Sequence, residues 1–139
     1  MTPQTFIGTK IIKAWPEAKN GEAGYAVQYP DGYTSWSPKA VFEEAYRPFQ
    51  GLTFGMALEA LKKGFTVARA GWNGSGMFAY LVPAASYPAQ TGAAKAHFGE
   101  GAMVPYRAYL ALKTAQGDVA TWAPSGSDAL AEDWYVVED

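Results

Sequence analysis

The first third of the chain alternates between apolar and polar residues, as β-strands do. Segments with this two-residue period cover residues 7–14, 24–29 and 33–36. Pro30-Asp31-Gly32 lies between the last two segments and has the composition of a tight turn. We therefore expect residues 1–48 to form a small β-rich module.

A short helix is expected to close this module. Ser37 suits the N-cap of the helix, and Pro38 suits its first position. The apolar residues that follow have helical spacing: Val41, Phe42, Ala45 and Tyr46. Residues 47–51 include Pro and Gly and predict a linker to the rest of the chain.

The second part, residues 52–139, begins with an amphipathic helix. Thr53 suits the N-cap of this helix, and Gly64 suits its C-terminal end. Its apolar residues fall on one stripe: Phe54, Ala57, Leu58 and Leu61.

Alternation returns after this helix. The predicted strands cover residues 65–69, 77–82, 106–114, 118–122 and 134–137. In the first strand, Phe65, Val67 and Arg69 share one face. Asn73-Gly74 precedes the second strand and is a strong hairpin signal, and Gln116-Gly117 predicts a hairpin between the third and fourth strands.

Two stretches of this part lack strand periodicity. Residues 83–103 are rich in Ala, Gly and Pro and predict a long loop. Residues 124–133 predict a turn and a short helical segment that is capped by Ser125 or Ser127. Together the elements predict an α+β fold with mainly antiparallel sheets, in which residues 52–139 form a small domain with one N-terminal helix.

Composition narrows the possible functions. The chain has 139 residues, of which 49% are hydrophobic, and this is enough for a packed core. Its formal net charge of -2 gives no basic surface for DNA or RNA, and the lack of Cys excludes disulfides and thiolate chemistry. No leader pattern and no run of about 20 apolar residues is present, so we expect a cytoplasmic protein without membrane contact.

Groups that catalyse reactions are scarce. His97 is the only histidine, and it has no matching nucleophile pattern. The acidic pairs Glu43-Glu44 and Glu132-Asp133 are typical of solvated helix faces, and no spacing resembles a metal site. Residues 71–76 are rich in Gly, but in a different order from a dinucleotide-binding loop. We expect a protein without catalytic residues, cofactor or metal.

Several residues suit a nucleotide ligand, although each also has a structural explanation. The helix start at Phe54-Gly55 offers free backbone N–H groups to a phosphate, or it only begins a core helix. Arg69 lies on an otherwise apolar face and needs an anion, which a ligand or an acidic side chain could supply.

Aromatic residues make up 15% of the chain and raise the same alternatives. Trp72 and Trp122 lie at predicted strand ends, where an indole ring either stacks on a base or packs into the core. Ser125, Ser127 and Asp128 either bind ribose hydroxyls and base edges or cap a helix. These residues permit a ligand site without requiring one.

Four blocks of the second part carry a family resemblance. They are Leu52-Thr-Phe-Gly-Met-Ala-Leu-Glu-Ala-Leu-Lys-Lys-Gly, Val67-Ala-Arg-Ala-Gly-Trp-Asn-Gly, Met77-Phe-Ala-Tyr-Leu-Val-Pro and Trp122-Ala-Pro-Ser-Gly-Ser-Asp-Ala-Leu-Ala-Glu-Asp-Trp-Tyr-Val-Val. In this order they resemble the second type of Thoeris anti-defence protein of phages. The first module resembles a recurrent phage module through residues 7–10, 29–33 and 35–47, and that second resemblance implies no activity.

The family resemblance implies a sponge that traps a cyclic nucleotide signal without cleaving it. The implied ligand is glycocyclic ADP-ribose, with cyclic dinucleotides as further candidates, and the implied assembly is a homo-oligomer, typically a tetramer, in the cytoplasm of the infected host. Carried over by position, the ligand contacts are Phe54, Gly55, Arg69, Trp72, Asn73, Trp122, Ser125, Ser127 and Asp128. The alternatives are an inhibitor that binds a host protein, a structural phage component and an enzyme that hydrolyses the signal.

Overall fold

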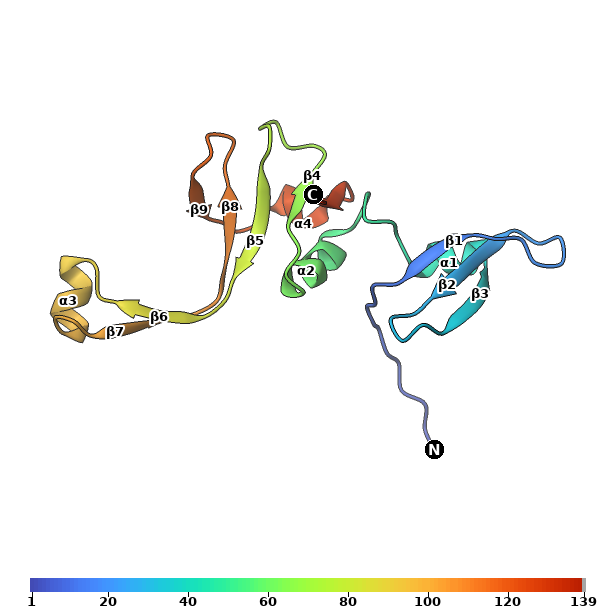
Figure 1. Ribbon diagram of the computed structural model, residues 1–139, viewed down its shortest axis with the longest axis horizontal. Helices are drawn as coiled ribbons and strands as arrows, with labels where there is room; N and C mark the ends of the chain where they lie inside the picture. The colour runs from blue at the N-terminus through green and yellow to red at the C-terminus, as the bar shows by residue number, and fades with distance from the viewer. Residues whose placement is uncertain (139) are drawn as a thin grey trace. The chain divides into compact units, whose positions relative to one another are not determined.

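A computed structural model of the chain describes residues 1–138 and divides the chain into two compact units (Figure 1). Unit 1 comprises Met1–Phe49, and unit 2 comprises Gln50–Asp139. Among the described residues, none of the helices is long and apolar enough to cross a membrane.

Unit 1 is a three-stranded antiparallel sheet with one helix. Its strands are β1 (Lys13–Pro16), β2 (Gly24–Gln28) and β3 (Thr34–Pro38), in the order β1-β2-β3. Helix α1 (Lys39–Ala45) packs against β2 and β3. Tyr25 of β2 stacks on Phe42 of α1 with ring centroids 4.2 Å apart, so aromatic rings join the helix to the sheet.

Two predictions for unit 1 are wrong. Most of the strand predicted for residues 7–14 does not form, because Lys13 already pairs with Gln28 at the end of β2, and earlier residues run past the partner strand. Ser37 is not the N-cap of α1, because it pairs with Tyr25 within β3. Pro38 therefore occupies the N-cap position, and the helix begins at Lys39.

Unit 2 is built on a five-stranded antiparallel sheet. The strand order is β10-β4-β5-β8-β9, where the strands are β4 (Val67–Arg69), β5 (Phe78–Val82), β8 (Tyr109–Lys113), β9 (Val119–Thr121) and β10 (Trp134–Val136). The hairpins predicted from Asn73-Gly74 and Gln116-Gly117 correspond to the antiparallel pairs β4–β5 and β8–β9. This arrangement confirms the predicted α+β class with mainly antiparallel sheets.

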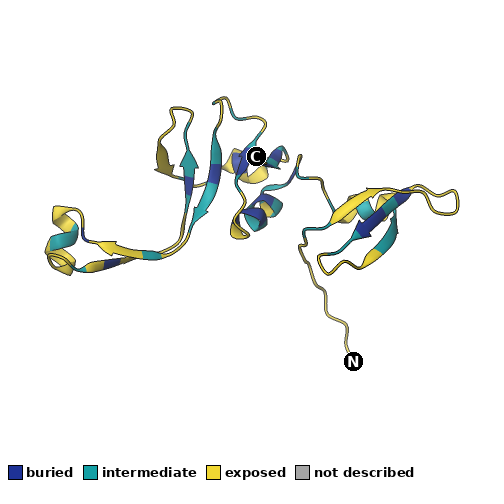
Figure 2. Cartoon of the chain, in the orientation of Figure 1, coloured by how far each residue is buried: buried dark blue, intermediate teal, exposed yellow. Residues whose placement is uncertain are grey.

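Helix α2 (Phe54–Lys62) covers one face of this sheet. Its N-cap is Thr53, as predicted, and the Thr53 hydroxyl accepts a hydrogen bond from the backbone N–H of Met56. The helix packs on β4, β5 and β10, and it buries Ala57, Ala60 and Leu61. Most buried residues of unit 2 therefore lie in α2 and in the strands of this sheet, and two others, Ala89 and Val104, lie beyond the sheet in residues 85–106 (Figure 2).

The loop predicted for residues 83–103 is instead a structured extension, which we call the arm (residues 85–106). It consists of β6 (Ala85–Pro88), α3 (Gly92–Phe98) and β7 (Met103–Tyr106), and the two strands pair only with each other. Figure 1 shows the arm continuing away from β5 and β8. Pro88 and Pro105 hid these strands from sequence analysis, but both strands of a two-stranded ribbon are edges, where proline is tolerated.

The short helix predicted within residues 124–133 is present as α4 (Gly126–Leu130). Of the two predicted caps, Ser125 is the one used: its hydroxyl accepts a hydrogen bond from the Asp128 backbone N–H at 3.1 Å. α4 packs against α2 and leads directly into the edge strand β10. The last part of the chain is thereby brought to the start of α2.

Candidate functional site

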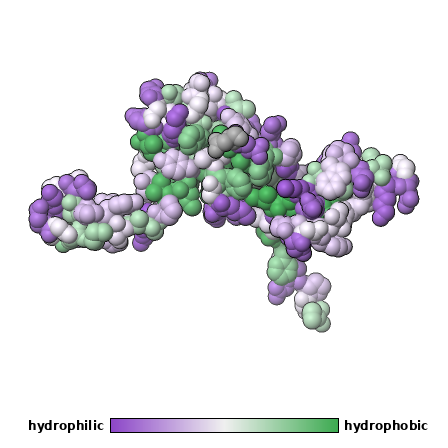
Figure 3. Space-filling view, in the orientation of Figure 1, coloured by the Kyte–Doolittle hydropathy of each residue, from purple (hydrophilic) through white to green (hydrophobic). Residues whose placement is uncertain are grey.

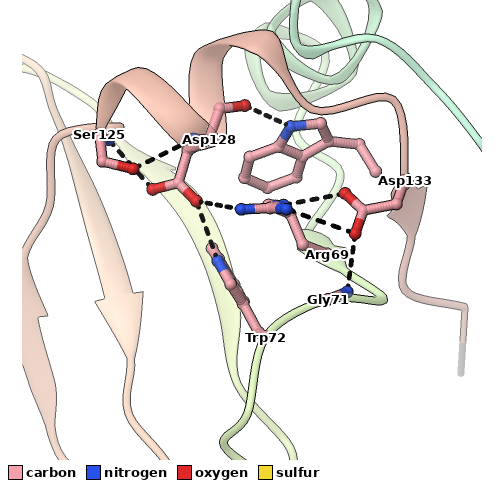
Figure 4. Close-up of polar contacts among 7 residues, drawn as sticks. Arg69, Gly71, Trp72, Ser125, Asp128 and Asp133 are labelled. Atoms are coloured by element: carbon pink, nitrogen blue, oxygen red, sulfur yellow. Dashed lines mark hydrogen bonds and ion pairs between the residues drawn. The ribbon is translucent and has the colours of Figure 1, made fainter.

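Arg69, at the end of β4, is the centre of an ionic cluster in unit 2 (Figure 4). Its Nη1 lies 2.9 Å from Oδ1 of Asp128, and its Nε lies 2.8 Å from Oδ1 of Asp133. The side chains are partly buried, with exposed fractions of 18% for Arg69 and 12% for Asp128. Of the two explanations for Arg69, an acidic side chain and a ligand, the structure contains the first.

Asp128 links this ion pair to a helix cap and to an indole ring. Its Oδ2 accepts a hydrogen bond from the Ser125 backbone N–H at 3.0 Å, which completes a capping box at the start of α4. Its Oδ1 also accepts a hydrogen bond from Nε1 of Trp72 at 3.1 Å. One carboxylate therefore holds β4, the loop after β4 and α4 together (Figure 4).

Asp133 fixes the other side of the cluster. Its Oδ2 accepts a hydrogen bond from the Gly71 backbone N–H at 2.7 Å, in addition to the ion pair with Arg69. Because Asp133 comes directly before β10, this contact ties the start of that strand to the turn that follows β4. Because Gly71 is held in this way, the backbone is fixed directly before Trp72.

Hydrogen bonding dominates the electrostatics of the cluster. Burial alone would raise the pKa of Asp128, but hydrogen bonds from Arg69, Ser125 and Trp72 outweigh it and lower that pKa from 3.8 to about 2. The hydrogen bond from Arg69 also lowers the pKa of Asp133, and both carboxylates raise the pKa of Arg69. One cation and two anions leave this triad with a formal charge of -1.

Aromatic rings pack beside the ionic cluster. Trp134 is fully buried, and its Nε1 donates a hydrogen bond to the backbone oxygen of Asp128 at 2.9 Å. Its ring centroid lies 5.3 Å from those of Phe54 and Trp72 and 6.0 Å from that of Trp122. We call these four residues the aromatic cluster. Phe54, Trp72 and Trp122 are half-buried.

The structure brings most of the residues proposed for ligand binding into one neighbourhood. Phe54, Trp72 and Trp122 belong to the aromatic cluster, while Arg69, Ser125 and Asp128 belong to the ionic cluster. Gly55, Asn73 and Ser127 lie exposed in the segments that surround both clusters. Their role in binding stays a prediction.

Sequence analysis missed two central members, Asp133 and Trp134. Glu132-Asp133 was interpreted as part of a solvated helix face, and Trp134 was only the first residue of a predicted strand. A signal was present, because Arg69 on an apolar face required an anion, which an acidic side chain could supply. Arg69 pairs with Trp134 across β4 and β10, and this pairing places Asp133, the preceding residue, beside Arg69. The hydrophobic periodicity of the sequence does not reveal which strands pair.

The chemistry available at this site is stacking and hydrogen bonding. Among residues 1–138, no group of His, Asp and Glu side chains could hold a metal ion. The guanidinium of Arg69 is already matched by two carboxylates, so a phosphate here would have to compete with them. Half-buried aromatic rings can stack on a base where an edge is accessible, and the site is therefore better suited to the base and ribose parts of a nucleotide than to its phosphates.

Comparisons with known proteins concern the same part of the chain. Residues 52–137 match the family model described as the Thoeris anti-defense 2-like domain. The chain is also 40% identical, over 87 residues, to the Thoeris anti-defense 2 protein of Bacillus phage SP01. That match covers 62% of this chain and 94% of the phage protein.

Proposed function

The chain belongs to the Thoeris anti-defense 2-like family, and on that premise we propose that it binds and sequesters a cyclic nucleotide immune signal without cleaving it. The family membership establishes an anti-defence function of phage type. The proposed ligand is glycocyclic ADP-ribose, with cyclic dinucleotides as further candidates. The proposed site of action is the cytoplasm of the infected host.

The observation that carries the proposal is the aromatic cluster within the family domain. Trp72 and Trp122 form a preformed pair of half-buried indoles, and stacking on such rings is worth about 1–3 kcal/mol for each base. Gly55, at the start of α2, leaves room for a ligand to approach the backbone. A Cβ built at this position would meet only the Thr53 hydroxyl, at 3.9 Å. A cyclic ligand has little conformational freedom to lose, which favours tight binding by such a rigid site.

The ionic cluster supports sequestration in a different way. Trp72 is held by its hydrogen bond to Asp128, which is itself fixed by Arg69 and Ser125. A ring positioned before the ligand arrives costs less ordering entropy on binding. We also propose that the protein is not an enzyme, since sequestration needs affinity and no turnover. The proposed assembly is the homotetramer that the family resemblance implies.

Ligand binding is tested by thermal unfolding with glycocyclic ADP-ribose and with a panel of cyclic dinucleotides. A sponge is stabilised by about 2.7 kcal/mol at a hundredfold excess of ligand over its dissociation constant, and it releases the ligand intact after heat denaturation. A cleaved ligand would instead identify an enzyme. No stabilisation by any of these ligands would favour the alternative, an inhibitor that binds a host protein.

The site assignment is tested by Trp122→Ala, since Trp122 contributes its ring to the cluster at a half-exposed position. We expect at least tenfold weaker binding in titration calorimetry, because one stacking partner is lost. Trp15→Ala is the matched control, since Trp15 is an exposed indole of unit 1 and lies outside the family domain. Equal loss of affinity in both variants, or in neither, would contradict the assignment.

A further inference from the structure

The chain has two Asn residues, and both are followed by Gly. One of them, Asn73, is exposed in the loop between β4 and β5. This loop lies at the upper edge of unit 2 in Figure 1, where the space-filling view shows a mixture of hydrophilic and weakly hydrophobic surface (Figure 3). Water therefore has access to the amide of Asn73.

The start of this loop is fixed by a hydrogen bond, and its middle is not. The backbone N–H of Gly71 donates to the carboxylate of Asp133 at 2.7 Å. Among residues 1–138, the structure contains no hydrogen bond that involves the Asn73 side chain or the backbone N–H of Gly74. The Asn73 side chain can therefore turn towards the next peptide bond, whose N–H has no acceptor to lose.

Packing requires glycine at position 74. A Cβ built on Gly74 would overlap Sδ of Met77, and it would lie 3.0 Å from Cβ of Ala115. Any other residue at this position would therefore displace the loop. The fold thus places directly after Asn73 the residue type whose backbone nitrogen is least shielded, because glycine has no side chain.

We propose that Asn73 is the preferred site of spontaneous deamidation in this chain. The backbone nitrogen of Gly74 attacks Cγ of Asn73, and the side-chain nitrogen leaves as ammonia with the proton that the Gly74 nitrogen gives up. The five-membered succinimide ring that forms then adds one water molecule. Opening of the ring at one carbonyl or the other gives aspartate or isoaspartate, so water is the only further reactant and no electrons are transferred.

The second Asn-Gly pair is held in a different way. Asn20 and Gly21 form a two-residue turn with φ angles of 51° and 79°, and Lys19 and Glu22 exchange two backbone hydrogen bonds of 2.9 Å across it. Ring closure needs the peptide between Asn and Gly to rotate, and in this turn the rotation breaks both hydrogen bonds. We therefore expect Asn20 to react about tenfold more slowly than Asn73, although both are exposed.

The modification changes the neighbourhood of the candidate site. Asn73 directly follows Trp72 of the aromatic cluster, and the triad of Arg69, Asp128 and Asp133 already has an excess of negative charge. A carboxylate at position 73 adds to that excess, and isoaspartate also lengthens the backbone directly after Trp72. One consequence rests on the proposed function: a signal with phosphate groups is bound about two- to fivefold more weakly after the reaction, a modest effect because water screens an exposed charge.

The proposal is tested by peptide mass spectrometry after the full chain has been kept in mildly alkaline buffer, with and without denaturant. Cleavage after Lys and Arg at mildly acidic pH separates the two sites, because Lys19 and Arg69 begin different peptides. A modified peptide gains the mass difference between OH and NH2. We expect Asn73 to react in the native protein about as fast as in the denatured chain, and Asn20 to react about tenfold more slowly in the native protein. Asn73→Gln should leave its peptide unmodified, because a longer side chain closes a ring less readily.

The outcomes separate this modification from the proposed function. Equal native rates at Asn73 and Asn20, or a native rate at Asn73 that is tenfold below its denatured rate, would overturn the preferred site. Titration with glycocyclic ADP-ribose then compares Asn73→Asp with Asn73→Gln, which keeps the amide. Equal affinities of these two variants would overturn the consequence for binding. A wild type that does not bind this ligand would count against the proposed function and would leave the modification, measured by mass alone, in place.

Discussion

Among single residues, Asp128 has the widest set of contacts with different parts of unit 2. Its side chain accepts hydrogen bonds from Arg69, Trp72 and Ser125, and its backbone oxygen accepts one from Trp134. Each donor belongs to a different segment. The three bonds to the side chain are strongest when the carboxylate is ionised, and the bond to the backbone oxygen needs helix α4 to be intact. The charge state of Asp128 therefore couples helix α4 to the aromatic cluster.

This coupling predicts a loss of stability in acid. The pKa of Asp128 is about 2 in the folded protein, below its value of 3.8 when unperturbed, so its stabilisation is present above pH 4 and is lost as the pH falls towards 2. The difference corresponds to about 2 kcal/mol of unfolding free energy. The lowered pKa of Asp133 acts in the same direction.

Urea unfolding at several pH values between 2 and 7 measures this effect, with Asp128→Asn as the comparison. We expect the wild type to be more stable than the variant at pH 7 and the gap to narrow by about 2 kcal/mol below pH 4. Carboxylates outside the cluster titrate in both proteins and cancel in the difference, whereas Asp133 shares Arg69 with Asp128 and contributes to the change. A gap that does not change with pH would show that Asp128 does not titrate as described.

Among the elements, α4 depends most on its cap. It has only five residues, buries only Asp128, and begins with the capping box formed by Ser125 and Asp128. Helices this short are not stable from intrinsic propensity, so the cap and its neighbours decide whether this helix forms.

Ser125→Ala is therefore expected to lower the free energy of unfolding by about 1 kcal/mol, because one backbone N–H of α4 loses its acceptor. Ser127→Ala provides a matched control two residues later, at an exposed position of the same helix. Calorimetric melting of both variants tests the assignment. A greater loss for Ser127→Ala would mean that the helix begins at the other serine.

The elements also show what sequence patterns could and could not predict. Local signals were sufficient for α2, where Thr53 and an apolar stripe mark the helix, and for the presence of α4, although they left its cap open between Ser125 and Ser127. They failed where pairing decides the outcome: β1 begins only at Lys13, opposite Gln28, and β6 and β7 form only because they face each other. The candidate site followed the same rule, because Arg69 was identified while its partner Asp133, from a distant segment, was not.

In the whole molecule, the family domain coincides with unit 2. The family match covers residues 52–137, and unit 2 starts at Gln50. Unit 1 has its own sheet, helix and aromatic contacts between them. We therefore expect unit 2 to fold without unit 1 and to carry the proposed signal binding alone.

Residues 50–139 expressed alone are expected to fold cooperatively and to keep the affinity of the full chain for the signal within about threefold. The reason is that the aromatic and ionic clusters consist entirely of unit 2 residues. Thermal melting and titration calorimetry on both proteins make the comparison. A fragment that melts cooperatively but does not bind would place part of the binding site in unit 1.

The packing of three tryptophans in unit 2 also has an optical consequence. The rings of Trp72, Trp122 and Trp134 lie 5.3–6.1 Å apart at interplanar angles between 70° and 79°. Indoles at such separations and angles couple their electronic transitions, and the coupling adds an exciton band to the far-ultraviolet circular dichroism of the backbone. Helix content calculated from that spectrum will therefore be misjudged, while the band itself reports without any label whether the three rings keep their native arrangement.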